Sequence, residues 1–146
     1  MNEVPDDRQW AWIGECGEFA DHAGMIYMTQ DRLESDEDVR FGFRVAPHHC
    51  NRRPQCHGGM MATFLDIALA RGLRVVGQVE PPLPTISLSI DFMKPAPLDA
   101  WVEARVRLGR VGKSTGFIAA WVYADDALAA RGSGVFRHFG KEISGN

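Results

Sequence analysis

The feature that most constrains this chain is an apolar helical segment with one carboxylate in its middle. From residue 58 to about residue 77, apolar side chains recur at helical spacing, among them Met61, Leu65 and Leu69. Two glycines open the segment and a proline-rich stretch follows it at 81–84, as expected for the two ends of a helix. Asp66 is the anomaly, because a lone acid on so apolar a helix is paired, surface-facing or functional.

Alternating apolar and polar residues, which are typical of half-buried strands, dominate the rest of the chain. Four such segments follow the helix, at 85–92, 101–108, 115–123 and 128–139, with a turn expected at 109–113. Before the helix we expect a short helix at 7–13, strands at 25–30 and 39–45, and a solvated acidic turn at 31–38. One long helix and five to six antiparallel strands define an α+β fold.

A single helix cannot cover both faces of a sheet of this size. The sheet must therefore curl around the helix, which leaves the other face and the edges to a partner chain. The 146 residues suit one domain spanning 1–146, and the sequence assigns no role to the N-terminal extension at 1–22.

Charge and composition exclude several classes of protein. The net charge of −3 argues against a general nucleic-acid binder. Three cysteines without framework spacing suit reduced thiols better than a disulfide scaffold. The sequence shows no signal peptide and no apolar run of the roughly 18 residues needed to span a bilayer. We therefore expect a cytoplasmic protein that does not enter a membrane.

Two loops suggest ligand sites that their spacing does not support. The first loop holds five potential metal ligands: His48, His49, Cys50, Cys56 and His57. Its two cysteines are too far apart for a zinc pair, and no second cluster completes a tetrahedron, so we expect no metal. The second, at 109–114, imitates a phosphate-binding loop but lacks its first glycine and leads into a strand. The sequence leaves two interpretations of this second loop: its cations contact an anionic ligand, or they are ordinary surface charge.

The spacing of Gly58 and Asp66 limits what they can do together. A helix start leaves backbone N–H groups unpaired and favours negative charge, so Gly58 could polarise a carbonyl. Eight residues of helix, however, separate the two residues by about 12 Å. They can meet one reacting group only if two copies of the helix pack antiparallel. A catalytic interpretation therefore requires a symmetric dimer.

Asn51, the turn from His57 through Gly58 to Gly59, and Asp66 together resemble the hotdog-fold acyl-CoA thioesterases of the phenylacetate-pathway (PaaI-like) type. The segments at 84–96, 109–110 and 131–136 are also similar, so that the resemblance covers roughly residues 40–140. In that family one long central helix is wrapped by a curved antiparallel sheet. The dimers pair edge to edge, share their active sites and often assemble into tetramers. The resemblance implies the same fold and a homodimer or homotetramer here.

The resemblance also implies a role for each matching residue. Asp66 would be the catalytic carboxylate, acting as general base on water or as direct nucleophile. The Gly58 N–H would polarise the thioester carbonyl from the opposite subunit. Asn51 would help to place water or the carboxylate, and His57 would support the turn. Thr85 stands where relatives carry a hydroxyl residue near the site.

The implied substrate is an acyl-CoA, and no metal or redox cofactor is required, because coenzyme A enters only as part of the substrate. The phosphates of coenzyme A should seek local cations, for which Arg110 and Lys113 come first and Arg131 follows. Gly59 and Met60 complete the predicted substrate contacts.

Two alternatives remain open from the sequence. One is a hotdog hydratase or dehydratase acting on acyl thioesters, and the other is a non-catalytic acyl-CoA binding domain.

The acyl pocket would be apolar, with Met61 and Phe64 as candidates beside Met60, although each of them suits core packing as well. The preferred acyl group cannot be deduced from the sequence.

Overall fold

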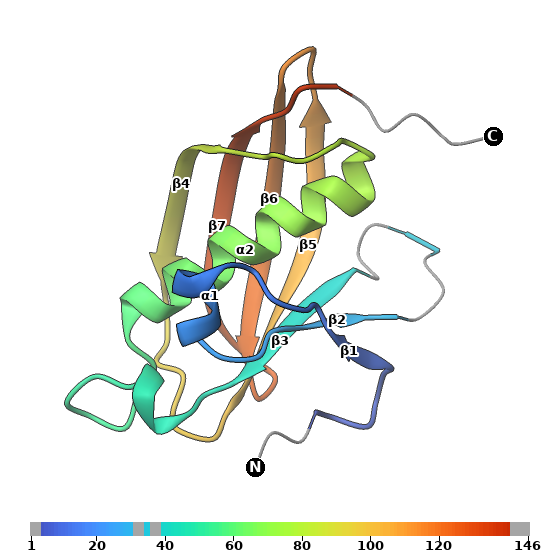
Figure 1. Ribbon diagram of the computed structural model, residues 1–146. Helices are drawn as coiled ribbons and strands as arrows, with labels where there is room; N and C mark the ends of the chain where they lie inside the picture. The colour runs from blue at the N-terminus through green and yellow to red at the C-terminus, as the bar shows by residue number, and fades with distance from the viewer. Residues whose placement is uncertain (1–3, 31–33, 36–38, 141–146) are drawn as a thin grey trace.

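The computed structural model describes residues 4–30, 34–35 and 39–140. One long helix, α2 (Gly58–Gly77), lies along the concave face of a curved antiparallel sheet of seven strands (Figure 1). The strands follow the order β1-β2-β3-β5-β6-β7-β4 across the sheet. The predicted α+β architecture is confirmed, with slightly more strands than the five to six expected. No helix among the described residues is long and apolar enough to cross a membrane.

The strands run over these bounds: β1 (Trp10–Trp12), β2 (Tyr27–Thr29), β3 (Arg40–Arg44), β4 (Thr85–Phe92), β5 (Trp101–Val111), β6 (Thr115–Ala124) and β7 (Ala127–Arg137). The described residues also include two short helices, α1 (Glu18–His22) and the 3-10 helix η2 (Pro47–His49). The predicted long helix and the strands expected at 25–30, 39–45, 85–92, 115–123 and 128–139 are confirmed within a few residues. The acidic turn expected at 31–38 lies largely outside the described residues.

The core lies between α2 and the concave face of the sheet. Leu65, Leu69 and Leu73, one helical turn apart, are fully buried and form the stripe of α2 that faces the strands. A Cβ atom added to Gly116 of β6 would lie 2.5 Å from a methyl carbon of Leu73, so this position has no room for a side chain. Close packing of this kind places the helix directly on the sheet.

The N-terminal prediction was wrong. Residues 10–12 form β1 rather than part of a helix, and the helix in this region is α1, farther along the chain. Tertiary packing explains the difference, because the rings of Trp10 and Tyr27 pack against Trp101. Their ring centroids lie 5.0 and 6.0 Å from that of Trp101. Trp101 in turn lies across Gly42, which leaves no space for a side chain there. This aromatic cluster joins β1 and β2 to the sheet.

The turn between β5 and β6 is shorter than predicted. β5 continues to Val111, so residues 109–111 belong to the strand and the turn begins at Gly112. A register shift between Leu108 and Arg110 interrupts the pairing with β6. Such a bulge changes the face toward which the following side chains point.

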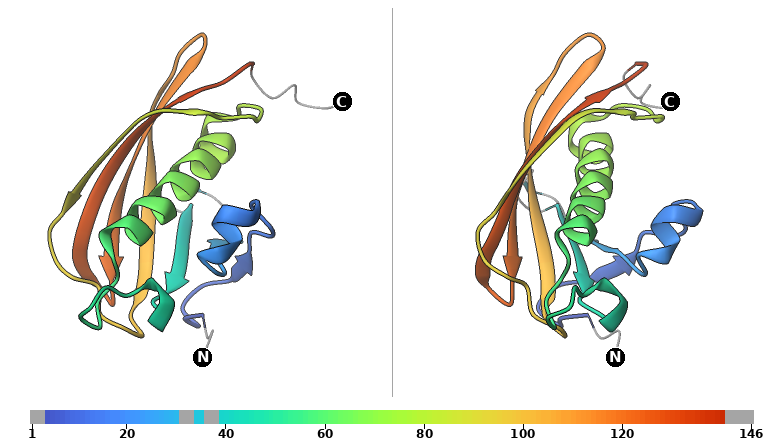
Figure 2. Two further views of the ribbon diagram at one scale, coloured as in Figure 1. Left: turned by 60° about the vertical axis from the view of Figure 1, so that its left-hand side comes forward. Right: turned by 90° about the vertical axis from the view of Figure 1, so that its left-hand side faces the viewer.

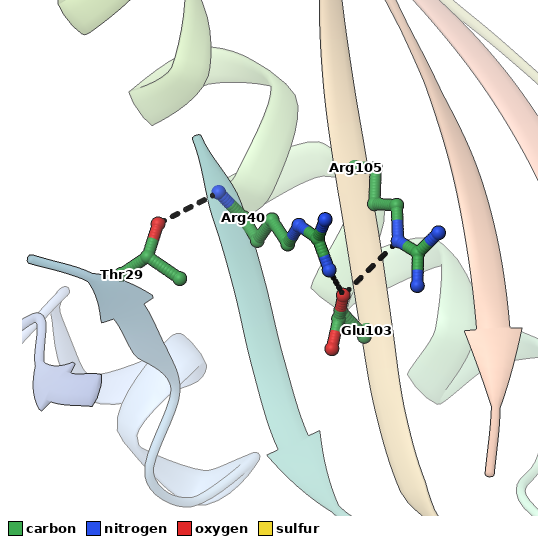
Figure 3. Close-up of polar contacts among 4 residues, drawn as sticks. All are labelled: Thr29, Arg40, Glu103 and Arg105. Atoms are coloured by element: carbon green, nitrogen blue, oxygen red, sulfur yellow. Dashed lines mark hydrogen bonds and ion pairs between the residues drawn. The ribbon is translucent and has the colours of Figure 1, made fainter. Parts of the chain in front are cut away.

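A nearly buried carboxylate links β3 and β5. Glu103 accepts from Arg40 Nη1 at 2.7 Å and from Arg105 Nε at 3.1 Å (Figure 3). The backbone N–H of Arg40 donates to Thr29 Oγ1 at 3.0 Å, so the same residue also ties β3 to β2. The Glu103 side chain is only 10% exposed, and both arginines depend on it for charge compensation.

Replacing Glu103 by glutamine should therefore lower the free energy of unfolding by about 3 kcal/mol, because it leaves two guanidinium groups facing an uncharged amide. Urea denaturation measures the change. The matched control is Asp91→Asn, which breaks a 2.8 Å ion pair to Arg131 whose two side chains are 62% and 56% exposed. That loss should stay below about 1 kcal/mol. Equal losses in the two variants would contradict the prediction.

Candidate active site

The first turn of α2 presents an unpaired backbone donor. His57 caps the helix, its Nδ1 accepting from the Gly59 N–H at 2.8 Å. Its carbonyl accepts from the N–H groups of Met60 and Met61 at 3.0 and 3.1 Å. The N–H of Gly58 has no acceptor among the residues that the structure describes. His57, which was predicted to support the turn, therefore acts as a helix cap that pairs the N–H of Gly59. The N–H of Gly58 stays unpaired at the positive end of the helix.

Gly58 opens into a cavity of about 330 Å³ between the start of α2 and the end of β4. Met61 lines it from the helix, and Phe92 and Lys94 line it from β4 and the residues after it. A Cβ on Gly58 would lie 3.6 Å from the Phe92 ring, an ordinary contact distance. Sequence reasoning missed Lys94, although a cation directly after an alternating strand was the signal that could have indicated it.

Asp66 projects from the third turn of α2 and is partly buried. The hydroxyl of Thr85, the first residue of β4, donates to Asp66 Oδ1 at 2.7 Å. The structure therefore brings these two predicted residues together across 19 positions of sequence. Oδ2 has no hydrogen-bond donor among the described residues, so one carboxylate oxygen is held and the other is available for chemistry.

The carboxylate faces a second cavity, of about 590 Å³. Thr63, Ile67 and Leu88 line this space together with residues 16–20 of the N-terminal region. None of its lining residues also lines the Gly58 cavity. Because α2 runs unbroken from Gly58 past Asp66, the two groups lie about 12 Å apart along the helix axis. Within one copy of the chain, the Gly58 N–H and the Asp66 carboxylate therefore face two separate cavities.

Asn51 shapes the loop before the helix rather than either cavity. Its side-chain oxygen accepts from the Arg53 N–H at 2.9 Å, and its own N–H donates to the Gln55 carbonyl at 3.0 Å. Asn51 is exposed and lines neither of the two cavities. Within one copy, the structure does not bring it to Asp66.

Cys56 in this loop is unsuited to nucleophilic or ligand chemistry. Cys50 and Cys56 face each other across an isolated β-bridge, and both thiols are free. Burial, reinforced by the neighbouring Cys50, raises the pKa of Cys56 to about 12. The thiolate, which is the reactive and ligating form, is therefore scarce at neutral pH. Among the described residues no group of His, Cys, Asp or Glu is arranged to hold a metal ion.

The three predicted cations lie away from both cavities. Val111 faces Gly77 of α2, so Arg110 beside it points to the other face of the sheet. Arg131 lies on that same outer face, in its ion pair with Asp91. Lys113 is exposed in the turn after β5. Of the predicted and missed cations, Lys94 alone lines one of the two cavities.

The apolar candidates divide between core and cavity. Phe64 is fully buried and its ring centroid lies 4.7 Å from that of Phe43, so it is a core residue. Met60 is partly buried against the core and lines neither cavity, and Gly59 is exposed. Met61 lines the Gly58 cavity while packing on the core.

Buried His49 holds the loop that precedes His57. Its Nδ1 accepts from the Ala46 N–H at 2.9 Å, and its Nε2–H donates to the Ala23 carbonyl in the N-terminal region. The His49 carbonyl accepts from the His57 N–H at 2.8 Å, which connects this anchor to the start of α2. Burial lowers the pKa of His49 below its ordinary value of 6.5, and the adjacent His48 adds to that effect.

Comparison with known proteins identifies relatives of this chain. Residues 55–130, just over half of its length, match the family model described as Thioesterase superfamily. A Pseudomonas aeruginosa protein whose name describes it as an esterase is 28% identical over 105 residues. The match covers 72% of this chain and 78% of that protein.

Solved structures share the fold. A mutant of the phenylacetic acid degradation protein PaaI from Thermus thermophilus matches with a TM-score of 0.68 at 22% identity, covering 83% of this chain and 98% of that chain. A Streptococcus mutans protein bound to acetyl CoA matches with a TM-score of 0.67 at 15% identity, covering 98% of both chains. These matches confirm the predicted hotdog fold.

The His49 anchor predicts a pH-dependent stability. Because the native pKa lies below the unfolded one, the unfolded state binds more protons below about pH 6.5. The stabilising effect of neutral His49 is complete above that pH and is lost as the pH falls toward the native pKa. Urea denaturation between pH 8 and pH 5 should show this decline. His49→Asn keeps an acceptor for Ala46 but cannot titrate, so its profile should be flatter, and identical profiles would contradict the prediction.

Proposed function

The chain belongs to the thioesterase superfamily and is a thioester hydrolase, and from this premise we propose that it hydrolyses acyl-CoA to a free acid and coenzyme A. One observation carries the proposal. A free helix-terminal N–H at Gly58 and a half-satisfied carboxylate at Asp66 lie on one helix but face separate cavities. These are the two functions that thioester hydrolysis needs, an electrophilic pole and a base or nucleophile.

The proposal requires a symmetric dimer, and β4 is its natural interface. β4 is the last strand of the sheet, and apolar Ile86 and Phe92 on it are 57% and 59% exposed. An unpaired apolar edge favours pairing with another strand. Antiparallel pairing of two copies about the middle of β4 brings Phe92 of one copy opposite Thr85 or Ile86 of the other. Phe92 borders Gly58 and Thr85 holds Asp66, so the two cavities would meet.

The chemistry then divides between the two copies. The carbonyl oxygen of the thioester, on which negative charge develops, accepts from the Gly58 N–H of one copy. Oδ2 of Asp66 from the other copy either takes a proton from the attacking water or attacks the carbonyl carbon to form a mixed anhydride. In the first route the carbon–sulfur bond breaks and the proton held by Asp66 passes to the departing sulfur, so that coenzyme A leaves as the thiol and the acid is released. In the second route coenzyme A leaves as the thiolate and takes a proton from water, and a second water then hydrolyses the anhydride to the free acid and Asp66. Thr85 holds Oδ1 and thereby aims Oδ2 in both routes.

The remaining assignments follow from the same geometry. Lys94, in the Gly58 cavity, is the nearest cation for the phosphates of coenzyme A. Arg110, Lys113 and Arg131 lie away from both cavities, so they would contact only a part of coenzyme A that extends beyond them. Trp121, 42% exposed on the outer face of the sheet, offers a surface on which two dimers could form a tetramer. We place the enzyme in the cytoplasm, with no cofactor, nucleic acid or membrane partner.

Asp66→Asn should lower kcat for acyl-CoA hydrolysis by about 10²–10⁴-fold, because the amide neither accepts a proton nor attacks the carbonyl. Release of free thiol measures the rate. The side chain keeps its shape and can still accept from Thr85, so thermal unfolding and the sedimentation of the oligomer should be unchanged. Turnover close to that of the wild type would exclude Asp66 as the catalytic group.

Gly58→Pro removes the proposed oxyanion donor without removing the helix. Proline is favoured at the first helical position, and His57 already has the φ of −63° and ψ of 140° that a residue before proline prefers. We expect kcat to fall by about 10²–10³-fold. Gly58→Ala is the matched control, since it keeps the N–H and its Cβ meets only an ordinary contact with Phe92. Similar losses in both variants would argue against a role for the N–H.

Mixing the two inactive variants tests whether the site is shared. In a dimer of one Asp66→Asn chain and one Gly58→Pro chain, one of the two sites contains both intact groups. Random co-assembly should therefore restore about one quarter of the wild-type activity. If both groups served the site of their own chain, no mixture of these variants would recover activity.

A further inference from the structure

The N-terminal region holds a segment to which the sequence assigned no role. We call residues 13–26, between β1 and β2, the N-terminal excursion. Its ends are closed by the Ile13 N–H, which donates to the Ile26 carbonyl at 3.0 Å. Within it, α1 lies on the side of α2 that faces away from the sheet (Figure 2). No residue of α1 is buried, and Phe19 is 77% exposed. Phe19 also lines the Asp66 cavity, so its exposed ring is available to a molecule that occupies this space.

The N-terminal excursion is fixed in place by polar contacts. Arg71 of α2 donates through Nη2 to Cys16 Sγ at 3.3 Å. Near the other end, the Ala23 carbonyl accepts from the buried ring of His49. The Cys16 N–H donates to Asp21 Oδ1 at 2.9 Å, which closes the loop onto α1. The excursion therefore keeps a defined position against α2.

Residues 16–20 of the excursion form one wall of the Asp66 cavity. The opposite wall consists of α2, including Ala62 and Ile67, and of Leu88 from β4. The volume of about 590 Å³ falls in the range typical of small-molecule sites. The two charged side chains that line it, Glu18 and Asp66, are both acidic. The phosphates of coenzyme A should therefore avoid this cavity and leave it to the other end of the substrate.

We infer that the N-terminal excursion is the acyl-binding wall of the site, and that Phe19 contacts an uncharged, apolar acyl group. The inference rests on the proposed function and names the substrate class that this function would serve. An apolar acyl group beside Asp66 would bury part of the exposed Phe19 ring, which favours binding. A terminal carboxylate on the acyl group would instead meet the like charges of Glu18 and Asp66. Aryl and alkyl acyl groups are therefore favoured over dicarboxylic ones.

The test compares acyl groups in the Phe19→Ala variant of the full chain. We expect kcat/KM for phenylacetyl-CoA to fall about 10-fold or more, and that for acetyl-CoA, whose acyl group has only one methyl to bury against Phe19, to change less than about 2-fold. Succinyl-CoA should be a poorer substrate than phenylacetyl-CoA for the wild type. The matched control is Phe139→Ala, an aromatic residue 61% exposed that lines no part of this cavity. If Phe19→Ala lowered kcat/KM equally for both acyl-CoAs, or for neither, the inference would be overturned. Dissociation of the oligomer in the Phe19→Ala variant would also overturn it.

A binding measurement separates this inference from the proposed function. The wild type should bind the stable thioether S-phenacyl-CoA more tightly than S-acetonyl-CoA, and Phe19→Ala should remove the difference. That result without any hydrolysis would support the acyl wall while rejecting the thioesterase mechanism. A preference that survives in Phe19→Ala, or is absent from the wild type, would overturn the acyl wall whatever the turnover.

Discussion

The close approach of α2 to the sheet is the constraint on which the rest of the structure depends. Three leucines of the helix lie over glycines of β6 and β7: Leu65 over Gly132, Leu69 over Gly134 and Leu73 over Gly116. Helical geometry then fixes what the neighbouring positions can do, because successive residues are turned by about 100°. Asp66, one position after Leu65, points out of the packed stripe toward β4 and meets Thr85. A Cβ at Gly116 or Gly132 would press on the methyl groups of Leu73 or Leu65, at 2.5 and 3.1 Å, whereas at Gly134 it would meet the Phe136 ring first.

The same packing explains why the proposed site would be divided between two copies. The helix can supply an unpaired N–H only at its start, and Asp66 lies two turns farther along. Both groups face the same edge strand, through Phe92 at one end of β4 and Thr85 at the other. A two-fold axis at the middle of that edge exchanges the two ends. An exposed apolar edge, which would be a liability in a monomer, is thereby the element that would complete the site.

The sequence predicted those parts of the fold that depend on local periodicity. The span of α2, most of the strands and the nearness of Thr85 to Asp66 follow from helical spacing, alternation and resemblance. The missed features depend on contacts distant in sequence. Trp10 joins a strand because Trp101 offers it a partner, and the bulge before Arg110 turns that side chain to the outer face. The position of Lys94 directly after an alternating strand is a local signal, but only the fold shows that this cation lines a cavity.

The charges around the two cavities would give the proposed shared site a direction. The Gly58 cavity carries the cation Lys94, and the Asp66 cavity is lined by the acids Glu18 and Asp66. If two copies join as proposed, each complete site receives its cation from one copy and its acids from the other. A substrate with phosphates at one end and an apolar acyl group at the other can then enter productively in one orientation. That orientation places the thioester where the two copies meet, between the helix terminus and the carboxylate, so the sorting of charge would itself contribute to positioning the reacting bond.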